Sequence, residues 1–136
     1  MAGYSGTPLV KKIGIKNGDR LFIVNQPAKF RELLGELPSD THLLSSPAGE
    51  LNIAIVFATS SGELKKKFAE SARRIAQNGM LWIAWPKKAS GIVSDLTENV
   101  VREIGLAQGL VDTKVCAIDE TWSGLRFVIR LKDRKP

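Results

Sequence analysis

The chain has 136 residues, a length that suits one domain with its own hydrophobic core. Hydrophobic residues make up 43% of the chain and charged residues 25%, without repeats or low-complexity segments, which excludes a fibrous or disordered protein. The formal net charge of +6 favours anionic partners, namely nucleotides, nucleic acids, acidic proteins or lipid head groups. A solvated basic surface explains this charge equally well, because the excess is spread along the chain.

A single cysteine, Cys116, excludes an internal disulfide framework and a cysteine-clustered zinc site. The N-terminal sequence MAGYSGTPLVKK lacks the apolar run of a signal peptide, and every apolar stretch is too short to span a bilayer. These features predict a soluble cytoplasmic protein without a membrane partner. We expect one domain over residues 1–136, with an N-terminal arm over 1–17 and a basic tail over 133–136.

The first half of the chain contains three predicted strands and one short helix. The apolar run at 20–25 predicts a strand, and Pro27 suits the first turn of a helix that Pro38 ends. The apolar face of that helix consists of Phe30, Leu33, Leu34 and Leu37. Residues 41–46 predict a second strand and residues 51–58 a third, whose nearly unbroken apolar sequence is typical of a strand covered on both faces.

A long amphipathic helix follows the third strand. Ser60 and Glu63 form a capping-box pair at its start, and Asn78-Gly79 is a typical helix end. The apolar stripe of this helix consists of Leu64, Phe68, Ala72, Ile75 and Ala76. A strand over residues 80–85 begins directly after it.

The C-terminal part predicts one more helix and a hairpin. Ser94 or Asp95 caps the helix, and Gly109 ends it. Two strands at 111–118 and 125–132 follow. The order β-α-β-β-α-β-α-β-β predicts an α/β fold, a three-layer Rossmann-like domain with a mostly parallel sheet of about six strands and a C-terminal antiparallel hairpin.

Sheets of this kind bind ligands beyond the carboxyl ends of their strands. One such end is the loop WPKKASG, which combines two lysines with donor groups and precedes a helix start, as an anion site requires. A strand end with a solvated loop is the alternative, and helix capping is the alternative for the other polar strand ends. The candidate ligand-binding residues are Lys87, Lys88, Ser90, Gly91, Thr59, Ser61, Asn25 and Trp85.

The segment DETWSG at 119–124 is a candidate protein interface. Asp119 and Glu120 are adjacent, so within a strand their carboxylates point to opposite faces and form no acid–base pair. Trp122 either packs back onto the domain or forms a contact surface with these acids. We predict no catalytic residue, because the lone His42 has no cysteine or serine partner for nucleophilic catalysis. We also predict no metal ligand.

The element order, the segment NGMLWIAW and the ending VDTKVCAIDETWSGLRFVIR resemble the class I methyltransferases over residues 18–132. The segments GYSGTPLVKKIGIKNG, WPKKASG, DLTENVVREIGL and VCAIDETWSGLRF also resemble recurring segments of a family of small bacterial proteins of unknown function. The resemblance implies a truncated, degenerate methyltransferase-like fold.

The motifs that bind S-adenosylmethionine in methyltransferases are missing. VNQPAKF stands where the glycine-rich turn is expected, and LLSSPAG lacks the acid that binds the ribose. The connection to LNIAIVFA is also too short for the usual extra strand and helix. We therefore expect a non-catalytic domain that binds a small anionic ligand or a protein partner at its strand ends, with S-adenosylmethionine disfavoured as cofactor and no oligomeric state predicted.

Two alternatives stay open. The first is an atypical enzyme related to nucleotide or S-adenosylmethionine chemistry. The second is a nucleic-acid-binding protein, which is less favoured because the sequence has no aromatic RNA-binding motif.

Overall fold

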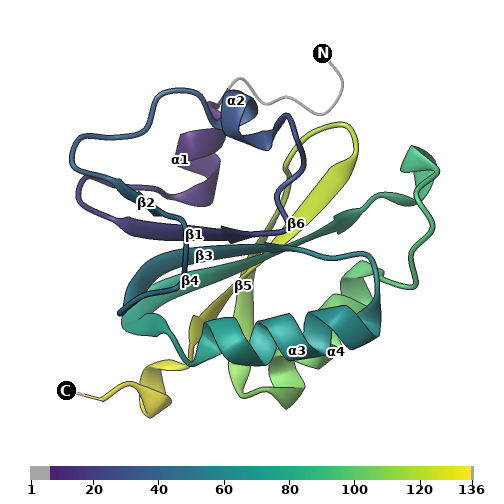
Figure 1. The fold of residues 1–136 in the computed structure, drawn as a ribbon. Coiled ribbons are helices and arrows are strands. Elements are labelled where there is room, and N and C mark those ends of the chain that lie inside the picture. The colour runs from purple at the N-terminus through teal and green to yellow at the C-terminus, as the bar shows by residue number, and fades with distance from the viewer. Residues whose placement is uncertain (1–6, 136) are drawn as a thin grey trace.

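The computed structural model describes residues 7–135, which form one six-stranded sheet with helices on both faces (Figure 1). The strands are β1 (Arg20–Val24), β2 (His42–Leu44), β3 (Leu51–Phe57), β4 (Ile75–Pro86), β5 (Leu110–Ala117) and β6 (Trp122–Ile129). The helices are α1 (Leu9–Ile13), α2 (Phe30–Leu34), α3 (Ser61–Ala72) and α4 (Glu98–Ala107), with 3-10 turns η1 (Lys88–Ser90) and η2 (Leu131–Asp133). The predicted three-layer α/β fold is confirmed.

The strands are arranged in the order β2-β1-β3-β4-β6-β5. The first four are mutually parallel, whereas β6 is antiparallel to both of its neighbours, so the predicted C-terminal hairpin is confirmed. The last strand lies inside the sheet, with Leu81 of β4 opposite Phe127 of β6. The parallel strands direct their carboxyl ends to one edge, where ligands of such sheets bind.

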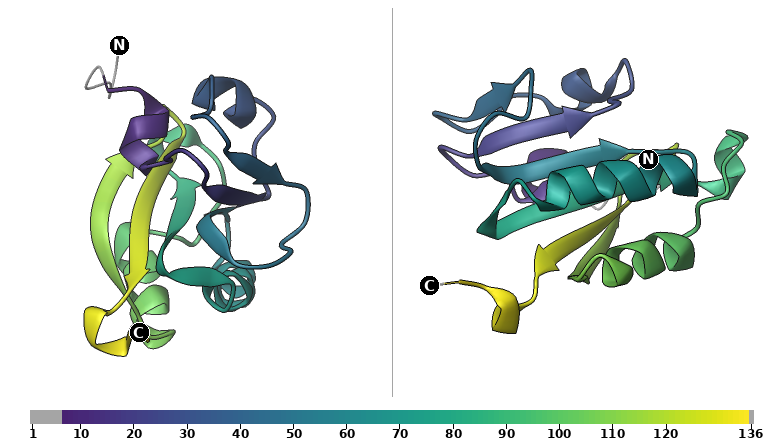
Figure 2. Two further views of the ribbon diagram at one scale, coloured as in Figure 1. Left: turned by 90° about the vertical axis from the view of Figure 1, so that its left-hand side faces the viewer. Right: turned by 60° about the horizontal axis from the view of Figure 1, so that its bottom comes forward.

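Two apolar layers hold the helices to the sheet. Figure 2 shows α3 and α4 covering one face, while α1 and α2 lie on the other. On the α3 side, the rings of Phe68 and Phe127 meet edge to face at 5.1 Å. On the α1 side, the fully buried Trp82 donates its indole Nε1–H to the carbonyl oxygen of Ile13 at 2.9 Å. This bond satisfies a polar group that would be costly to bury alone.

The connection from β2 to β3 crosses the sheet without a helix. Residues 45–50 contain no regular element, and Arg20 fixes their path by donating to the carbonyl oxygens of Ala48 and Glu50. Because no helix covers β1 there, Phe22 and Val24 are only partly buried on that face. The short connection therefore leaves a depression beside α3.

The predicted C-terminal part of the long helix is wrong. α3 ends at Ala72, and Ile75 and Ala76 belong to β4. Ile75 pairs with Leu51 of β3, and the Leu51 amide donates to the Arg74 carbonyl at 2.8 Å. Strand pairing buries Ile75 as well as a helix would, and it satisfies backbone groups of β3 at the same time.

The predicted cap of the last helix is also wrong. Thr97 caps α4, its hydroxyl accepting from the Val100 amide at 3.2 Å. Asp95 instead accepts from the backbone amide and the hydroxyl of Ser61, which ties α3 to the loop before α4. The carboxylate is therefore engaged by another helix start and is turned away from its own.

The structure adds a helix to the N-terminal arm and corrects the bounds of the last strand. The N-terminal arm contains α1, whose Ile13 is fully buried; residues 1–6 of the arm lie outside the described part. Strand β6 covers 122–129 rather than 125–132, because Trp122 already pairs with Pro86, and Leu131 is 79% exposed. None of the helices between residues 7 and 135 is long and apolar enough to cross a membrane.

Candidate ligand-binding site

A pocket of about 390 Å³ opens at the carboxyl end of β4. This carboxyl-edge pocket is lined by residues that include Trp85, Pro86, Lys87, Lys88, Thr97 and Ser123. β4 supplies the buried Trp85, and Ser123 lies opposite it on β6. The start of α4 closes another side through Thr97. The pocket thus joins the predicted lysine loop to a helix N-terminus.

The loop that carries the two lysines is anchored at both ends. The Lys87 amide donates to the Thr121 carbonyl at 2.7 Å, and the Ser90 amide donates to the Lys87 carbonyl at 3.0 Å. The Ser90 hydroxyl accepts from the Ile92 amide, and Gly91 turns the chain with φ 79°. Ser90 and Gly91 therefore shape the loop, whereas Lys87 and Lys88 face the pocket.

The electrostatics of the carboxyl-edge pocket favour an anion. In the described part of the chain, no carboxylate forms an ion pair with Lys87 or Lys88. The Thr97 hydroxyl caps the Val100 amide, whereas the amides of Glu98 and Asn99 have no intrahelical partner, and they lie at the positive end of the helix dipole. Glu98 lines the pocket too, but its carboxylate accepts from Arg102 at 2.6 Å.

The Arg102 pair offsets the charge of Glu98. Two hydrogen bonds raise the pKa of the Arg102 guanidinium above its ordinary value. The larger effect comes from the bond to Glu98, and the smaller from the bond to Asp112 at 2.9 Å. The Arg102 side chain is only partly buried, so we assign this cluster an orienting role. It keeps the acid at the helix start turned toward a cation instead of toward the lysines.

A second, smaller cavity lies at the ends of β1 and β3. It measures about 180 Å³, and both Asn25 and Thr59 line it. Asn25 adopts a left-handed conformation with φ 57°, and its amide donates to the Phe57 carbonyl and to the Glu63 carboxylate, each at 3.3 Å. Glu63 therefore does not complete the predicted capping box, although the Ser60 hydroxyl accepts from the Glu63 amide.

The residues at the end of β1 do not fit the usual binding mode of S-adenosylmethionine. Asn25 stands where that mode needs a glycine-rich backbone, and its side chain bridges β1 to β3 and α3. The ring of Phe57 packs edge to face with Phe30 at 4.8 Å and with Trp122 at 5.1 Å. The cavity left there is smaller than the roughly 300–1,000 Å³ that is typical of ligand pockets.

The other predicted site residues have structural contacts. Ser61 bonds to Asp95 and lies in neither cavity. Asp119 accepts from the amides of Thr121 and Trp122 at 2.8 and 2.7 Å, which makes it the turn residue of the β5–β6 hairpin. Trp122 packs on Phe57, as noted, and Glu120 is exposed.

No group of acids, histidines and cysteines within residues 7–135 has the arrangement of a metal site. The exposed His42 lies on edge strand β2, away from the carboxyl-edge pocket. Cys116 lies on β5, and burial raises the pKa of its thiol above the ordinary value, which disfavours the reactive thiolate.

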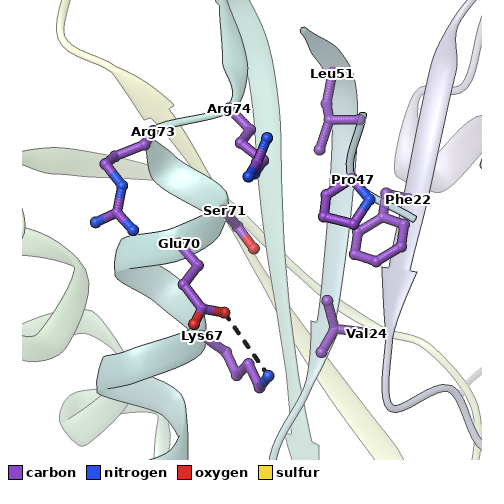
Figure 3. Close-up of a pocket in the computed structure, with 9 residues that line it drawn as sticks. All are labelled: Phe22, Val24, Pro47, Leu51, Lys67, Glu70, Ser71, Arg73 and Arg74. Atoms are coloured by element: carbon purple, nitrogen blue, oxygen red, sulfur yellow. Dashed lines mark ion pairs between the residues drawn. The ribbon is translucent and has the colours of Figure 1, made fainter. Parts of the chain in front are cut away.

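The sequence analysis missed a third cavity, of about 370 Å³, on the sheet face beside α3 (Figure 3). This sheet-face pocket lies between β1 and the C-terminal half of α3, and its lining includes Phe22, Val24, Pro47, Ser71, Arg73 and Arg74. The short connection between the second and third strands was the one signal for it, because it leaves no room for a covering helix.

Comparison with known proteins shows the fold. A methyltransferase dependent on S-adenosylmethionine, from Aquifex aeolicus, matches with a TM-score of 0.61 and 15% identity over 94% of this chain and 91% of its own. The magnesium protoporphyrin IX methyltransferase of Synechocystis PCC 6803, with bound S-adenosylmethionine, matches with a TM-score of 0.59 and 10% identity over 90% and 74%. Fibrillarin of Aeropyrum pernix, also with S-adenosylmethionine, matches with a TM-score of 0.57 and 11% identity over 93% and 70%.

The domain therefore has the class I methyltransferase-like, Rossmann-like fold that the sequence predicts. No family model matches the chain, and no curated protein matches it. Identities of 10–15% show the fold alone.

Proposed function

We propose that this methyltransferase-like domain binds a small anionic ligand in the carboxyl-edge pocket. The observation that carries the proposal is the joining of Lys87, Lys88 and the start of α4 around one cavity. Ammonium groups and free helix amides together form a common site for phosphate and carboxylate groups. The volume of about 390 Å³ is that of a small-molecule site.

The position of the pocket supports the same proposal. It lies at the edge where parallel strands end, and in doubly wound sheets this edge carries the ligand. Trp85 and Leu96 add apolar surface, so the preferred ligand combines an anionic group with an apolar or aromatic part. A nucleotide meets this description. The pocket favours a small molecule over a protein partner, because the candidate interface residue Trp122 packs on Phe57.

The related structures favour a second candidate, an enzyme related to S-adenosylmethionine chemistry, over a purely non-catalytic role. All three proteins compared above share the fold, and two of them hold S-adenosylmethionine. In this chain, such a ligand would need a mode that avoids the closed end of β1. The carboxyl-edge pocket is then its place as well, so one experiment tests both candidates.

The experiment is a thermal-shift comparison with phosphate, nucleotides, S-adenosylmethionine and S-adenosylhomocysteine. A ligand at about one hundred times its Kd stabilises a protein by roughly 2.7 kcal/mol, which raises the Tm by several degrees. The test variant is Lys87→Ala/Lys88→Ala. The control is Lys65→Ala/Lys66→Ala, which removes the same charge from the exposed face of α3.

A shift that disappears in the Lys87/Lys88 variant and persists in the control supports the proposal. Phosphate or nucleotides as the active ligands favour the first candidate, and S-adenosylmethionine or S-adenosylhomocysteine the second. A shift that survives in the Lys87/Lys88 variant, or the absence of any shift, contradicts both. Binding of single-stranded DNA that falls steeply with salt would instead favour the nucleic-acid alternative.

A further inference from the structure

The sheet-face pocket combines an apolar floor with a basic rim (Figure 3). We propose that it binds a small molecule with a flat apolar body and one anionic group. This site is separate from the carboxyl-edge pocket, since the two share no lining residue. The proposal therefore does not depend on the function proposed above.

The floor of the sheet-face pocket is the part of β1 that no helix covers. Phe22 and Val24 are partly buried there, next to Pro47 from the connection between β2 and β3. The hydrogen bonds from Arg20 to the carbonyl groups of Ala48 and Glu50 hold this connection in place. The floor is therefore preformed, and an aromatic ring and a proline offer a flat apolar contact.

The rim carries more positive than negative charge. Arg73 and Arg74 line the pocket, and within residues 7–135 neither guanidinium has an ion-pair or hydrogen-bond partner. Lys67 also lines it, but its ammonium lies 3.7 Å from the Glu70 carboxylate, so these two charges offset each other. The two arginines give the rim its excess charge, and guanidinium groups bind carboxylates, phosphates and sulfonates through paired hydrogen bonds.

Ser71 marks the position of the anionic group. It is only 6% exposed, and its hydroxyl has no hydrogen-bond partner among the described residues. Figure 3 shows this hydroxyl directed from α3 toward the floor of the pocket. A hydroxyl that faces the cavity and has no bond within the described chain can donate to an anion bound there, and Arg73 and Arg74 line the same cavity.

Two of the last four carbonyl groups of α3 are occupied within the backbone, which weakens the negative end of the helix dipole at this site. The carbonyl oxygens of Ala69 and Ser71 accept from the amides of Arg73 and Arg74, and the Arg74 carbonyl accepts from Leu51. These carbonyl groups are therefore satisfied within the backbone. The charges that face the cavity come from side chains.

The test uses two fluorescent probes that differ by one group. 1-Anilinonaphthalene-8-sulfonate has a flat apolar body and a sulfonate, and N-phenyl-1-naphthylamine is the same molecule without the sulfonate. We expect the chain with an unchanged sheet-face pocket to bind the sulfonate probe about tenfold more tightly, which corresponds to one charge-assisted contact. Binding is measured by fluorescence titration of the folded protein.

Three variants locate the site. In Arg73→Gln/Arg74→Gln, the preference for the sulfonate probe should disappear, while Lys65→Gln/Lys66→Gln, with the same loss of charge, should change it less than about twofold. Ser71→Ala should weaken binding of the sulfonate probe about threefold or more without changing that of the neutral probe. All titrations are run in the Lys87→Ala/Lys88→Ala background, which removes the lysines of the carboxyl-edge pocket, so that the signal reports the sheet-face pocket.

Equal affinity for the two probes would overturn the proposal, because the pocket would then be an apolar surface without an anion site. Equal losses in the Arg73/Arg74 and Lys65/Lys66 variants would overturn it as well, since net charge alone would explain the binding. Thermal unfolding of every variant shows that it is folded during the titration.

Discussion

Gly105 of α4 is the position where one methyl group should destabilise the fold most clearly. It is buried against β6, and a Cβ added there would lie 2.0 Å from Cε2 of Phe127. Ordinary contact begins at 3.4 Å, so ring or helix must move by about 1.4 Å. The ring has little room for this movement, because Phe127 is fully buried and meets Phe68 at an interplanar angle of 85°.

The predicted magnitude is the balance of two effects. Alanine is favoured over glycine within a helix by about 1 kcal/mol, whereas overpacking of a core costs about 1–3 kcal/mol and sometimes more. The overlap at Gly105 is severe, so we place the cost at or above the upper end of that range. We therefore expect Gly105→Ala to lower the free energy of unfolding by about 2 kcal/mol, and the Tm by about 8 °C.

Urea unfolding followed by tryptophan fluorescence measures this change. The matched control is Gly62→Ala in α3, where an added Cβ meets nothing within 4 Å and where we expect no loss of stability. Adding Phe127→Leu to Gly105→Ala should recover part of the cost, giving a double variant more stable than the sum of the single changes. A Gly105→Ala variant as stable as the wild type would refute the packing argument.

Three further predictions concern two sets of side-chain hydrogen bonds and one thiol. Trp82→Phe should lower the free energy of unfolding by about 1–3 kcal/mol, because the Ile13 carbonyl loses its donor. Amide hydrogen exchange should become faster first in α1. A uniform increase of the exchange rate across the sheet would contradict this prediction. Asp95→Ala should cost about 1–2 kcal/mol in urea unfolding, since it removes the acceptor for the amide and hydroxyl of Ser61. Asp133→Ala, at an exposed position, is the control. Burial raises the pKa of the Cys116 thiol, so this group contributes stability that is present below the unfolded pKa of about 8.5 and lost as the pH rises through the folded pKa. Iodoacetamide at pH 8 should therefore modify the native chain more slowly than the chain unfolded in urea. Equal rates would contradict the burial of the thiol.

The sequence predicts the strands and helices well where the apolar pattern is long. β3 is an example, because seven consecutive residues with little polar character leave no alternative to a covered strand. Ile75 shows the limit of this reasoning. Its apolar side chain continues the helical stripe, yet pairing with Leu51 buries it in β4. A periodic pattern reports which side chains are buried, and here two backbone conformations bury the same one.

The candidate site is predicted in part for a similar reason. Lys87 and Lys88 follow an obvious strand end, so their place at the carboxyl edge could be inferred from chain order. The roles of Ser61 and Asp95 could not, because they bond to each other across 34 positions of sequence. The sheet-face pocket was missed because Phe22 and Arg74 are brought together only by the tertiary fold.

The interior position of β6 has a consequence for synthesis on the ribosome. The strand that completes the sheet, Trp122–Ile129, is the last of its six strands to be made, and it must enter between β4 and β5. Until it emerges, one side of β4 has no neighbour, and an unpaired apolar strand promotes association between chains. The sheet of a nascent chain therefore stays open until β6 has emerged, and chains stopped short of residue 122 should be substrates for chaperones or proteases.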